Sequence, residues 1–346
     1  MIHSRTARIH SSASTVPGRG ATVAAVDQLA GFLDGPRARG AFLLRSLLDP
    51  PWSLRIQDEA PLTLVAVVRG EAWVVHDGGG PPRRIGAGDT AIIRGPDPYT
   101  VADDPATAPQ IVIHPGQRCT TPEGVSLSEE MDLGVRTWGT NPDGSVVILT
   151  GTYTTDGEVS RWLLEALPRL VVVEADAWDS PLPGLLAQEI TRDEPGQEVV
   201  LDRLLDLLLV AALRAAFARA DADVPSWYRA HGDPVVGKAL RLIHGDPAHP
   251  WTVADLAAGS GVSRALLARR FHELVGEPPM TFLTNWRMAL AADLLLEPGA
   301  TVGGVSRRVG YASPFTFSTA FKRAHGASPS AYRARGLAAP PVPATA

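Results

Sequence analysis

The sequence contains very little cysteine: Cys119 is the only one among 346 residues. A single thiol excludes a disulfide framework within the chain, and it excludes a zinc site built from several thiolates. The lack of disulfides is typical of proteins in a reducing compartment. We therefore expect a cytoplasmic protein.

Long apolar runs are also missing. The most apolar stretch, residues 199–217, carries four charged side chains, which are Asp202, Arg203, Asp206 and Arg214. These charges are too many for a segment that crosses a bilayer, so we expect no membrane partner. The first 18 residues have no apolar core and do not match a secretory signal. We expect residues 1–20 to be a flexible N-terminus.

The composition indicates a globular protein of two parts. Hydrophobic residues make up 45% of the chain and charged residues 20%, which excludes disorder as the main state. The net charge of −5 hides an asymmetry, because residues 232–346 hold 12 basic and 7 acidic residues while residues 1–231 hold 20 and 30. This split indicates a nucleic-acid module joined to another domain, although chance variation in surface charge would look the same.

The first half of the chain has the pattern of a small β-barrel or sandwich. Short apolar runs alternate with Gly- and Pro-rich turns such as residues 77–82. The runs that we expect to form strands are residues 62–68, 71–76, 90–94, 110–114 and 146–150.

Helical patterning begins near Ser160. We expect helices at residues 161–167, 182–190 and 199–219, followed by a linker at 221–225. The third helix has a wide stripe of Leu and Ala, which must pack on another element of the chain or on a second copy. The sequence leaves both alternatives open.

The C-terminal helices form a repeat. Expected helices at residues 235–244, 253–258, 264–275, 280–296, 302–309 and 315–325 precede a last short turn that begins at Ser328 and Pro329. An offset of 50 matches three residues of the first unit with three of the second, which are Ser263 with Ser313, Phe271 with Phe321, and Gly276 with Gly326. An offset of 49 matches the capping threonines and the turn glycines, which are Thr252 with Thr301 and Gly261 with Gly310. Each unit is a capped helix, a glycine turn and a longer second helix, which is the pattern of a helix-turn-helix.

The second helix of each unit is a candidate to enter a major groove. Arg269 can donate two bonds to guanine, while Arg264 and Arg270 are expected to hold phosphates. The full set of candidate DNA-binding residues is Ser263, Arg264, Ala265, Ala268, Arg269, Arg270, Ser313, Pro314, Phe315, Ser318, Thr319, Lys322 and Arg323. The alternative is a helical bundle with a solvated basic face.

Residues 310–323, Gly-Tyr-Ala-Ser-Pro-Phe-Thr-Phe-Ser-Thr-Ala-Phe-Lys-Arg, and 326–333, Gly-Ala-Ser-Pro-Ser-Ala-Tyr-Arg, resemble the signature of AraC/XylS-family transcription regulators. The resemblance covers roughly the last 110 residues. It implies two helix-turn-helix units bridged by a long helix, with recognition helices in major-groove segments about 34 Å apart. It also implies double-stranded DNA, RNA polymerase and a second copy of the chain as partners. Phe315 and Thr319 depart from the polar residues frequent in the family, so we expect the second helix to position the protein or contact thymine methyls.

Residues 69–74, 86–93 and 164–168 resemble the cupin-type sensor domains found on this family. The resemblance implies a barrel that holds a small-molecule effector. Candidate lining residues are Trp52, Arg55, Trp73, His76, Tyr99 and His114. Metal-dependent cupins carry two histidines separated by one residue, and neither His76 nor His114 has such a neighbour. We therefore expect no metal, no cofactor and no catalytic residues.

These observations predict an α+β multidomain protein with an N-terminal cupin-like β-barrel with helices and a C-terminal all-α domain with two helix-turn-helix units. The expected segments are a flexible N-terminus (1–20), a barrel sensor (21–155), a helical dimerisation region (156–220), a linker (221–233), a DNA-binding domain (234–336) and a flexible tail (337–346). The expected function is a sequence-specific transcription regulator controlled by an effector. The alternatives are a constitutive regulator whose barrel only dimerises and a cupin enzyme fused to a DNA-binding domain.

Overall fold

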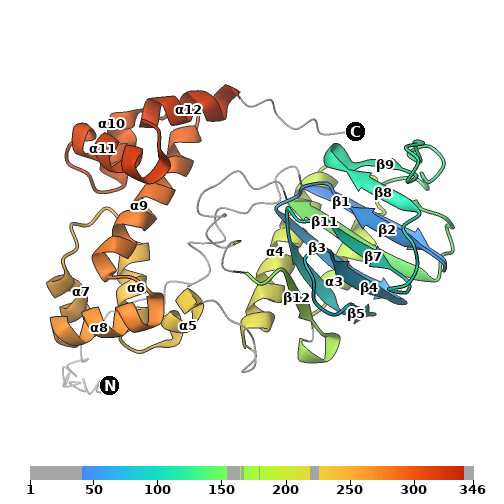
Figure 1. Cartoon of the computed structure of the whole chain (residues 1–346), viewed down its shortest axis with the longest axis horizontal. Coiled ribbons are helices and arrows are strands. Elements are labelled where there is room, and N and C mark those ends of the chain that lie inside the picture. The colour runs from blue at the N-terminus through green and yellow to red at the C-terminus, as the bar shows by residue number, and fades with distance from the viewer. Residues whose placement is uncertain (1–40, 154–163, 165–166, 179, 219–225, 339–346) are drawn as a thin grey trace, which may run out of the picture.

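A computed structural model describes residues 41–153, 164, 167–178, 180–218 and 226–338. Its N-terminal part contains two six-stranded sheets (Figure 1). The first has the order β10 (Thr137–Gly139), β1 (Phe42–Leu48), β11 (Val146–Tyr153), β3 (Leu62–Arg69), β6 (Thr90–Arg94) and β12 (Leu170–Val173). The second has the order β5 (Arg83–Gly86), β4 (Glu71–His76), β7 (Tyr99–Ala102), β2 (Ser53–Ile56), β8 (Ile111–His114) and β9 (Arg118–Thr120).

Strand β3 shows why the first sheet is buried on both faces. Its Val65 and Val67 pack into a core shared with the second sheet, and its Leu64 and Ala66 pack into a separate core. Successive side chains of a strand point to opposite faces, so a strand covered on both sides is apolar throughout. The two sheets therefore form a sandwich, with a further layer on the outer face of the first sheet.

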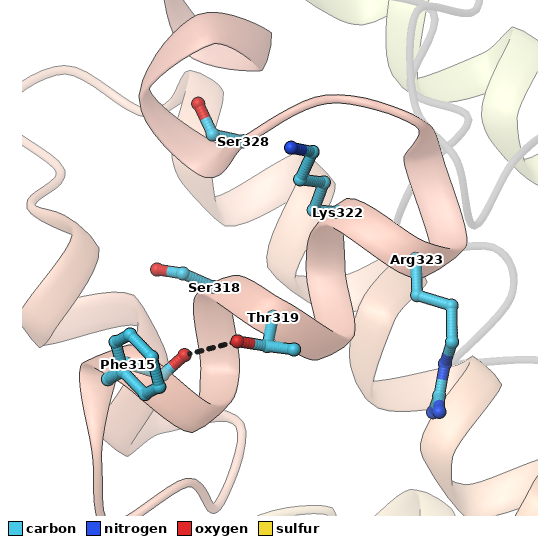
Figure 2. Close-up of a pocket in the computed structure, with 6 residues that line it drawn as sticks. All are labelled: Phe315, Ser318, Thr319, Lys322, Arg323 and Ser328. Atoms are coloured by element: carbon cyan, nitrogen blue, oxygen red, sulfur yellow. Dashed lines mark hydrogen bonds between the residues drawn. The ribbon is translucent and has the colours of Figure 1, made fainter.

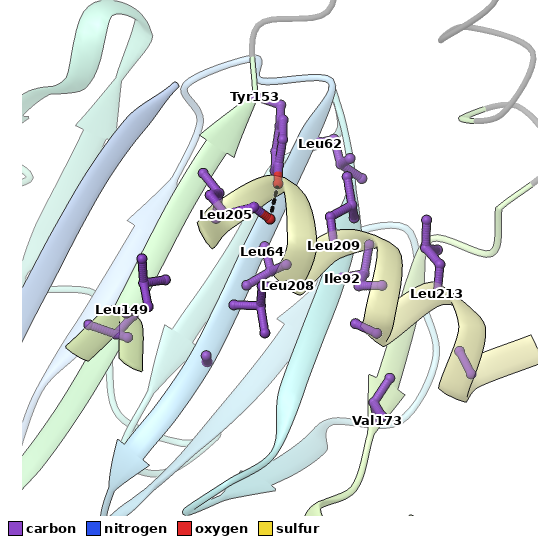
Figure 3. Close-up of a cluster of buried hydrophobic side chains, with 14 of the residues drawn as sticks. Leu62, Leu64, Ile92, Leu149, Tyr153, Val173, Leu205, Leu208, Leu209 and Leu213 are labelled. Carbon is purple, nitrogen blue, oxygen red and sulfur yellow. Dashed lines mark hydrogen bonds between the residues drawn. The ribbon is translucent and has the colours of Figure 1, made fainter. Parts of the chain in front are cut away.

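That outer layer consists of α3 (Leu182–Glu189) and α4 (Gln197–Ala218). Figure 3 shows the inner side of α4 lying over the first sheet, with Leu208 and Leu209 among the buried side chains. Gly151 of β11 allows a close approach, because a Cβ there would lie 2.9 Å from Cδ2 of Leu205. The hydroxyl of Tyr153 donates a hydrogen bond of 2.9 Å to the backbone carbonyl of Leu205. These contacts fix the position of α4 along the sheet.

The structure confirms the five expected strands, which form as β3, β4, β6, β8 and β11. It corrects the expectation that residues 156–220 are helical, because β12 lies within them and pairs with β6. The branched sequence Leu-Val-Val-Val favours a strand, and it buries Val173 under α4. The expected flexible N-terminus and most of the expected helix at 161–167 lie outside the described residues.

The C-terminal part contains two small cores joined by one helix. Its helices are α5 (Ser226–Gly232), α6 (Val236–Gly245), α7 (Val253–Ser260), α8 (Arg264–Val275), α9 (Pro279–Leu296), α10 (Val302–Arg308), α11 (Pro314–His325) and α12 (Pro329–Ala338). The first core includes Leu267, Phe271 and Trp286, and the second includes Phe317 and Phe321. Helix α9 contributes to both cores, so it sets the distance between the two units.

The structure confirms the six expected helices as α6 to α11. It corrects two expectations nearby. Helix α5 lies within the expected linker 221–233, because Ala230 and His231 are buried against the first core. The expected short turn after Ser328 is the longer helix α12. Residues 221–225 and most of the expected tail lie outside the described residues. None of the helices in the described ranges is long and apolar enough to cross a membrane.

The two turn glycines offer a matched test of the repeat. Gly261 and Gly310 have φ of 74° and 80°, a conformation that costs a side-chain-bearing residue about 1–2 kcal/mol. A Cβ on Gly261 would meet open space, whereas one on Gly310 would lie 2.5 Å from the carbonyl oxygen of Ala248. We expect Gly261→Ala to lower the free energy of unfolding by about 1 kcal/mol and Gly310→Ala by about 2 kcal/mol or more. Urea unfolding of the full chain measures both, and equal losses would contradict the crowding at Gly310.

Candidate DNA interface and sensor pocket

Helix α8 presents one apolar and one exposed face. Ser263 caps its N-terminus, accepting a hydrogen bond of 3.2 Å at Oγ from the backbone N–H of Leu266. Leu267 and Phe271 are fully buried in the first core. Ala265 and Arg269 are exposed on the opposite side. The predicted division of this helix into a core face and an outward face is confirmed.

Helix α11 repeats this arrangement. Ser313 caps it, and Pro314 occupies its first position, where the missing N–H costs nothing. Phe317 and Phe321 are fully buried, while Phe315 is 82% exposed. Single exposed apolar side chains are common on protein surfaces, and the ring of Phe315 is accessible to a partner molecule.

The outward side of α11 borders a shallow hollow. Its lining residues are Phe315, Ser318, Thr319, Lys322, Arg323 and Ser328. In Figure 2, Arg323 extends in a different direction from Lys322. The hydroxyl of Thr319 donates a hydrogen bond of 3.1 Å to the backbone carbonyl of Phe315, which fixes its rotamer and uses its only donor. This side of α11 therefore offers methyl groups, an aromatic ring and two cations.

The arginines of α8 have different surroundings. The guanidinium Nε of Arg269 lies 3.8 Å from a carboxylate oxygen of Glu273, and 69% of the Arg269 side chain is exposed. An exposed ion pair of this length is weak, so Arg269 is available to a base. Arg264 is exposed at the start of the helix. Both stand at positions where the sequence predicted DNA contacts.

Arg270, a predicted phosphate contact, also joins α8 to the start of α6 through Asp233. Its Nε and Nη2 donate to Oδ2 of Asp233 at 2.8 and 2.6 Å. The other oxygen of Asp233 accepts the backbone N–H groups of Val235 and Val236, each at 2.9 Å. Asp233 was not predicted as functional, because the pair joins residues 37 positions apart and no local pattern reveals it. The structure gives Arg270 a positioning role for α8.

The pKa of the Asp233 carboxyl reflects this network. Burial raises the pKa. The backbone N–H groups of Val236 and Val235 and the guanidinium of Arg270 together lower it by more, so the pKa lies below its ordinary value. A carboxyl group with a lowered pKa stabilises the fold at neutral pH. This stabilisation is lost as the pH falls through the pKa of the folded state. Asp233 therefore stays ionised and keeps α8 fixed at neutral pH.

The six candidate effector residues do not form one site. Strand alternation places Trp52, His76 and Tyr99 on the side of the second sheet that faces the first, and Arg55, Trp73 and His114 on its outer side. Trp52 and Tyr99 are buried in the core. His76 lines a cavity that lies beside β12.

The two charged or titratable candidates on the outer side, Arg55 and His114, have partners within the chain. Arg55 forms an ion pair with Asp77. His114 contacts Oγ1 of Thr120 through Nε2 at 2.9 Å and Gln57 through Nδ1 at 3.4 Å. These contacts are those of a satisfied structural histidine. Within the described part of the chain, no three His, Cys, Asp or Glu side chains gather as metal ligands would.

Comparisons with known proteins agree with this architecture. A family model described as "Cupin" matches residues 27–218, and one described as "Helix-turn-helix domain" matches residues 256–335. The chain is 34% identical over 286 residues to a protein named as an AraC-like transcription regulator in Streptomyces lividans, covering 82% of this chain and 90% of that one. It is 32% identical over 287 residues to a protein of the same description in Streptomyces antibioticus, with the same coverage.

Among solved structures, the DNA-binding domain of AdpA, described as a global transcriptional factor in complex with a target DNA, is 33% identical, with a TM-score of 0.30. The likeness covers 31% of this chain and 95% of that one. Both Streptomyces relatives are described as AraC-like transcription regulators, and the match covers 90% of the length of each. The chain therefore belongs to the AraC-type family of DNA-binding transcription regulators, with a cupin domain preceding its helix-turn-helix domain.

Proposed function

We propose that the exposed sides of α8 and α11 read DNA in two adjacent major-groove segments. The observation that carries this proposal is the repeated arrangement of the two helices. Each is capped by a serine, buries its phenylalanine side in its own core and presents the opposite side to solvent. A rigid pair of such helices joined by α9 fits two groove segments on one side of a duplex.

The two helices are proposed to use different chemistry. Arg269 has a planar guanidinium with little competition from Glu273, which suits bidentate contact with guanine. Phe315 cannot hydrogen-bond to a base edge, so its ring is assigned to thymine methyl groups. Arg264, Lys322 and Arg323 are assigned to phosphates, and Ser263, Ala265, Ala268, Ser313, Pro314, Ser318 and Thr319 complete the proposed surface. Arg270 remains a proposed phosphate contact, because its side chain is 44% exposed beside its ion pair with Asp233.

Arg269→Ala tests the assignment of base readout. We expect this variant to lose about 1–3 kcal/mol of binding to the preferred site and to relax the preference at one base position. The measurement is selection of binding sites from random duplexes by the full-length protein. Arg264→Ala serves as the control, because loss of a phosphate contact weakens all sequences alike and lowers the salt dependence. A uniform loss for Arg269→Ala would reassign this residue to the backbone.

A homodimer formed through α4 is the second part of the proposal. The inner side of α4 packs on the first sheet, while Val200 and Leu207 are 44% and 54% exposed, with Leu204 and Ala211 half-buried between and beyond them. Spacings of four, three and four residues place these side chains in one stripe, the pattern of a two-helix seam. Leu204 also packs against the core under α4, so the proposed seam shares Leu204 and Ala211 with the predicted Leu-rich stripe and adds Val200 and Leu207 on the exposed side.

Leu207→Glu tests the seam. Because Leu207 is exposed in the single chain, the change should leave the fold intact and convert a dimer into a monomer in sedimentation equilibrium. Val125→Glu, at a residue 63% exposed in the loop after β9, is the matched control and should leave the dimer unchanged. A dimer that survives Leu207→Glu would place the interface elsewhere.

Control by a small-molecule effector in the cupin domain is the third part of the proposal, with the barrel acting as a sensor rather than an enzyme. The regulator would act in the cytoplasm with RNA polymerase. We assign the sensor to residues 21–155, the dimerisation region to 156–220 and the DNA-binding domain to 234–336. The test is the affinity of the full-length protein for its selected operator with and without candidate effectors.

A further inference from the structure

A small cavity lies where edge strands of the two sheets approach each other. Its volume is about 200 Å³, and its walls come from β4, the β4–β5 turn, β5 and β12. Strand β5 is an edge of the second sheet and β12 an edge of the first. The lining residues are Val74, His76, Gly79, Gly80, Pro81, Arg83, Arg169, Leu170 and Val172. The cavity therefore lies at one open side of the sandwich, between edge strands of the two sheets.

The polar groups in this lining are all nitrogen donors. They are His76, Arg83 and Arg169, and the lining contains no carboxylate. Both ring nitrogens of His76 are buried and make no hydrogen bond of ordinary geometry among the described residues, while the backbone of Arg169 lies close to the ring. A buried polar group without a partner costs free energy, and a ligand atom can supply the missing partner. Val74, Leu170 and Val172 give the rest of the wall an apolar character.

Arg169 is held loosely at the mouth of the cavity. Its Nη2 lies 3.3 Å from a carboxylate oxygen of Asp97, and the side chains of both residues are about half exposed. Its guanidinium also lies against the backbone of Gly78, where a Cβ would collide with it. An exposed pair of this kind is weak, so a second carboxylate can share or replace Asp97.

His76 is expected to be neutral and to act as a hydrogen-bond donor. Burial is the main cause that lowers its pKa, and the nearby charge of Arg169 lowers it further, while Asp97, Asp77 and the backbone of Arg169 act in the opposite direction. The neutral imidazole carries one N–H and one acceptor nitrogen. Its N–H can donate a hydrogen bond to an anionic ligand that is also attracted by Arg83 and Arg169.

We propose that this cavity binds a small organic carboxylate whose acid group meets Arg169 and His76 and whose compact apolar part rests on Val74, Leu170 and Val172. The inference rests on the proposed effector control and gives its ligand a chemical class. Pockets for drug-sized ligands are typically about 300–1,000 Å³, so a cavity of about 200 Å³ selects a small molecule. A bidentate arginine contact distinguishes a carboxylate from the matching alcohol.

The position of β12 connects this cavity to the dimerisation helix. Leu170 and Val172 face the cavity and the inter-sheet core, whereas Val171 and Val173 face the core under α4. Figure 3 shows Val173 on the sheet side of α4, and Val173 and Leu213 belong to the same buried cluster. A ligand that displaces β12 would therefore change the support of the last turns of α4. This route couples effector binding to the geometry of the dimer.

The test uses the full-length protein and a panel of linear, branched and aromatic monocarboxylates of four to eight carbons, each paired with its alcohol. Binding is measured by calorimetry, and operator affinity is measured with the best binder. We expect one or more acids to bind, with the matching alcohols at least tenfold weaker. Arg169→Gln and Arg83→Gln should weaken the binding tenfold or more. Arg84→Gln is the matched control, because Arg84 is the adjacent residue on β5, lies outside the lining and pairs with Glu71.

The outcomes separate this inference from the proposed function. If no acid binds, if alcohols bind equally well, or if Arg169→Gln and Arg84→Gln behave alike, the carboxylate site is wrong, while an operator selected by Arg269 would still stand. If an acid binds through Arg169 but operator affinity and dimerisation do not change, the site stands and effector control through it is wrong.

Discussion

Phe321→Ala is expected to unfold the second helix-turn-helix unit while leaving the first unit folded. Phe321 is fully buried in the core formed by the end of α9 with α10 and α11. Its ring packs against the rings of Phe317, His325 and Tyr332 at centroid distances of 5.6, 4.4 and 5.4 Å. Truncating a buried phenylalanine costs about 3–5 kcal/mol. The second core is small, so this loss is a large part of its local stability.

The repeat supplies a reciprocal variant. Phe271 occupies the matching place in α8, where its ring meets Phe282 at 5.7 Å in an edge-to-face contact. We expect Phe271→Ala to open α6, α7 and α8, and Phe321→Ala to open α10, α11 and α12. Amide hydrogen exchange of the full chain, followed by mass spectrometry, measures each unit separately. Specific DNA binding should be lost in both variants, because each one unfolds a helix that we propose to contact DNA.

Phe315→Ala is the control within the same helix. Its ring is 82% exposed, so the substitution should change stability by less than about 0.5 kcal/mol while weakening binding to the operator. Loss of protection in both units after either Phe271→Ala or Phe321→Ala would show that the two cores unfold as one. In that case α9 would transmit the loss from one core to the other.

The arrangement of these two cores could be predicted from the sequence because every signal involved is local. Serine caps, positive-φ glycines and phenylalanines recur at offsets of 49 and 50 residues. Each of them fixes a helix end or a buried side within a few positions along the chain. The faces of α8 and α11 followed directly from the 3.6-residue period.

Features that depend on distant partners could not be predicted in this way. The side chain of Arg270 looks like a solvent-exposed cation until Asp233 is placed beside it. Strand β12 consists of four residues, and its identity depends on pairing with β6, about 80 residues earlier in the chain. The effector candidates were chosen by residue type, and the two-residue period of their strands then placed half of them on the outer side of the second sheet.

Acid is expected to destabilise the DNA-binding domain through His244. The ring of this residue, at the end of α6, lies 4.6 Å from that of Trp286, 5.4 Å from that of His231 and 5.7 Å from that of Phe282, measured between centroids. Burial, and to a smaller extent the nearby His231, lower the pKa of His244 from 6.5 to about 3. The folded domain thus requires a neutral imidazole, whereas the unfolded chain accepts a proton near pH 6.5.

The sign of the effect follows from this difference. Above pH 6.5 both states are neutral and the contribution of His244 to stability is complete, and it falls by about 1.4 kcal/mol per pH unit until pH nears 3. We therefore expect a loss of about 3 kcal/mol between pH 7.5 and pH 4, to the order of magnitude. His244→Leu should remove this component, and His272→Gln, at an exposed histidine of α8, should leave it intact. The measurement is urea unfolding across this pH range, with hydrogen exchange of α6 and α9 to isolate the domain.

Equal pH dependence in the parent and in His244→Leu would show that the carboxylates alone cause the acid response. A steeper dependence in the parent would assign this part of the acid response to the buried imidazole of His244.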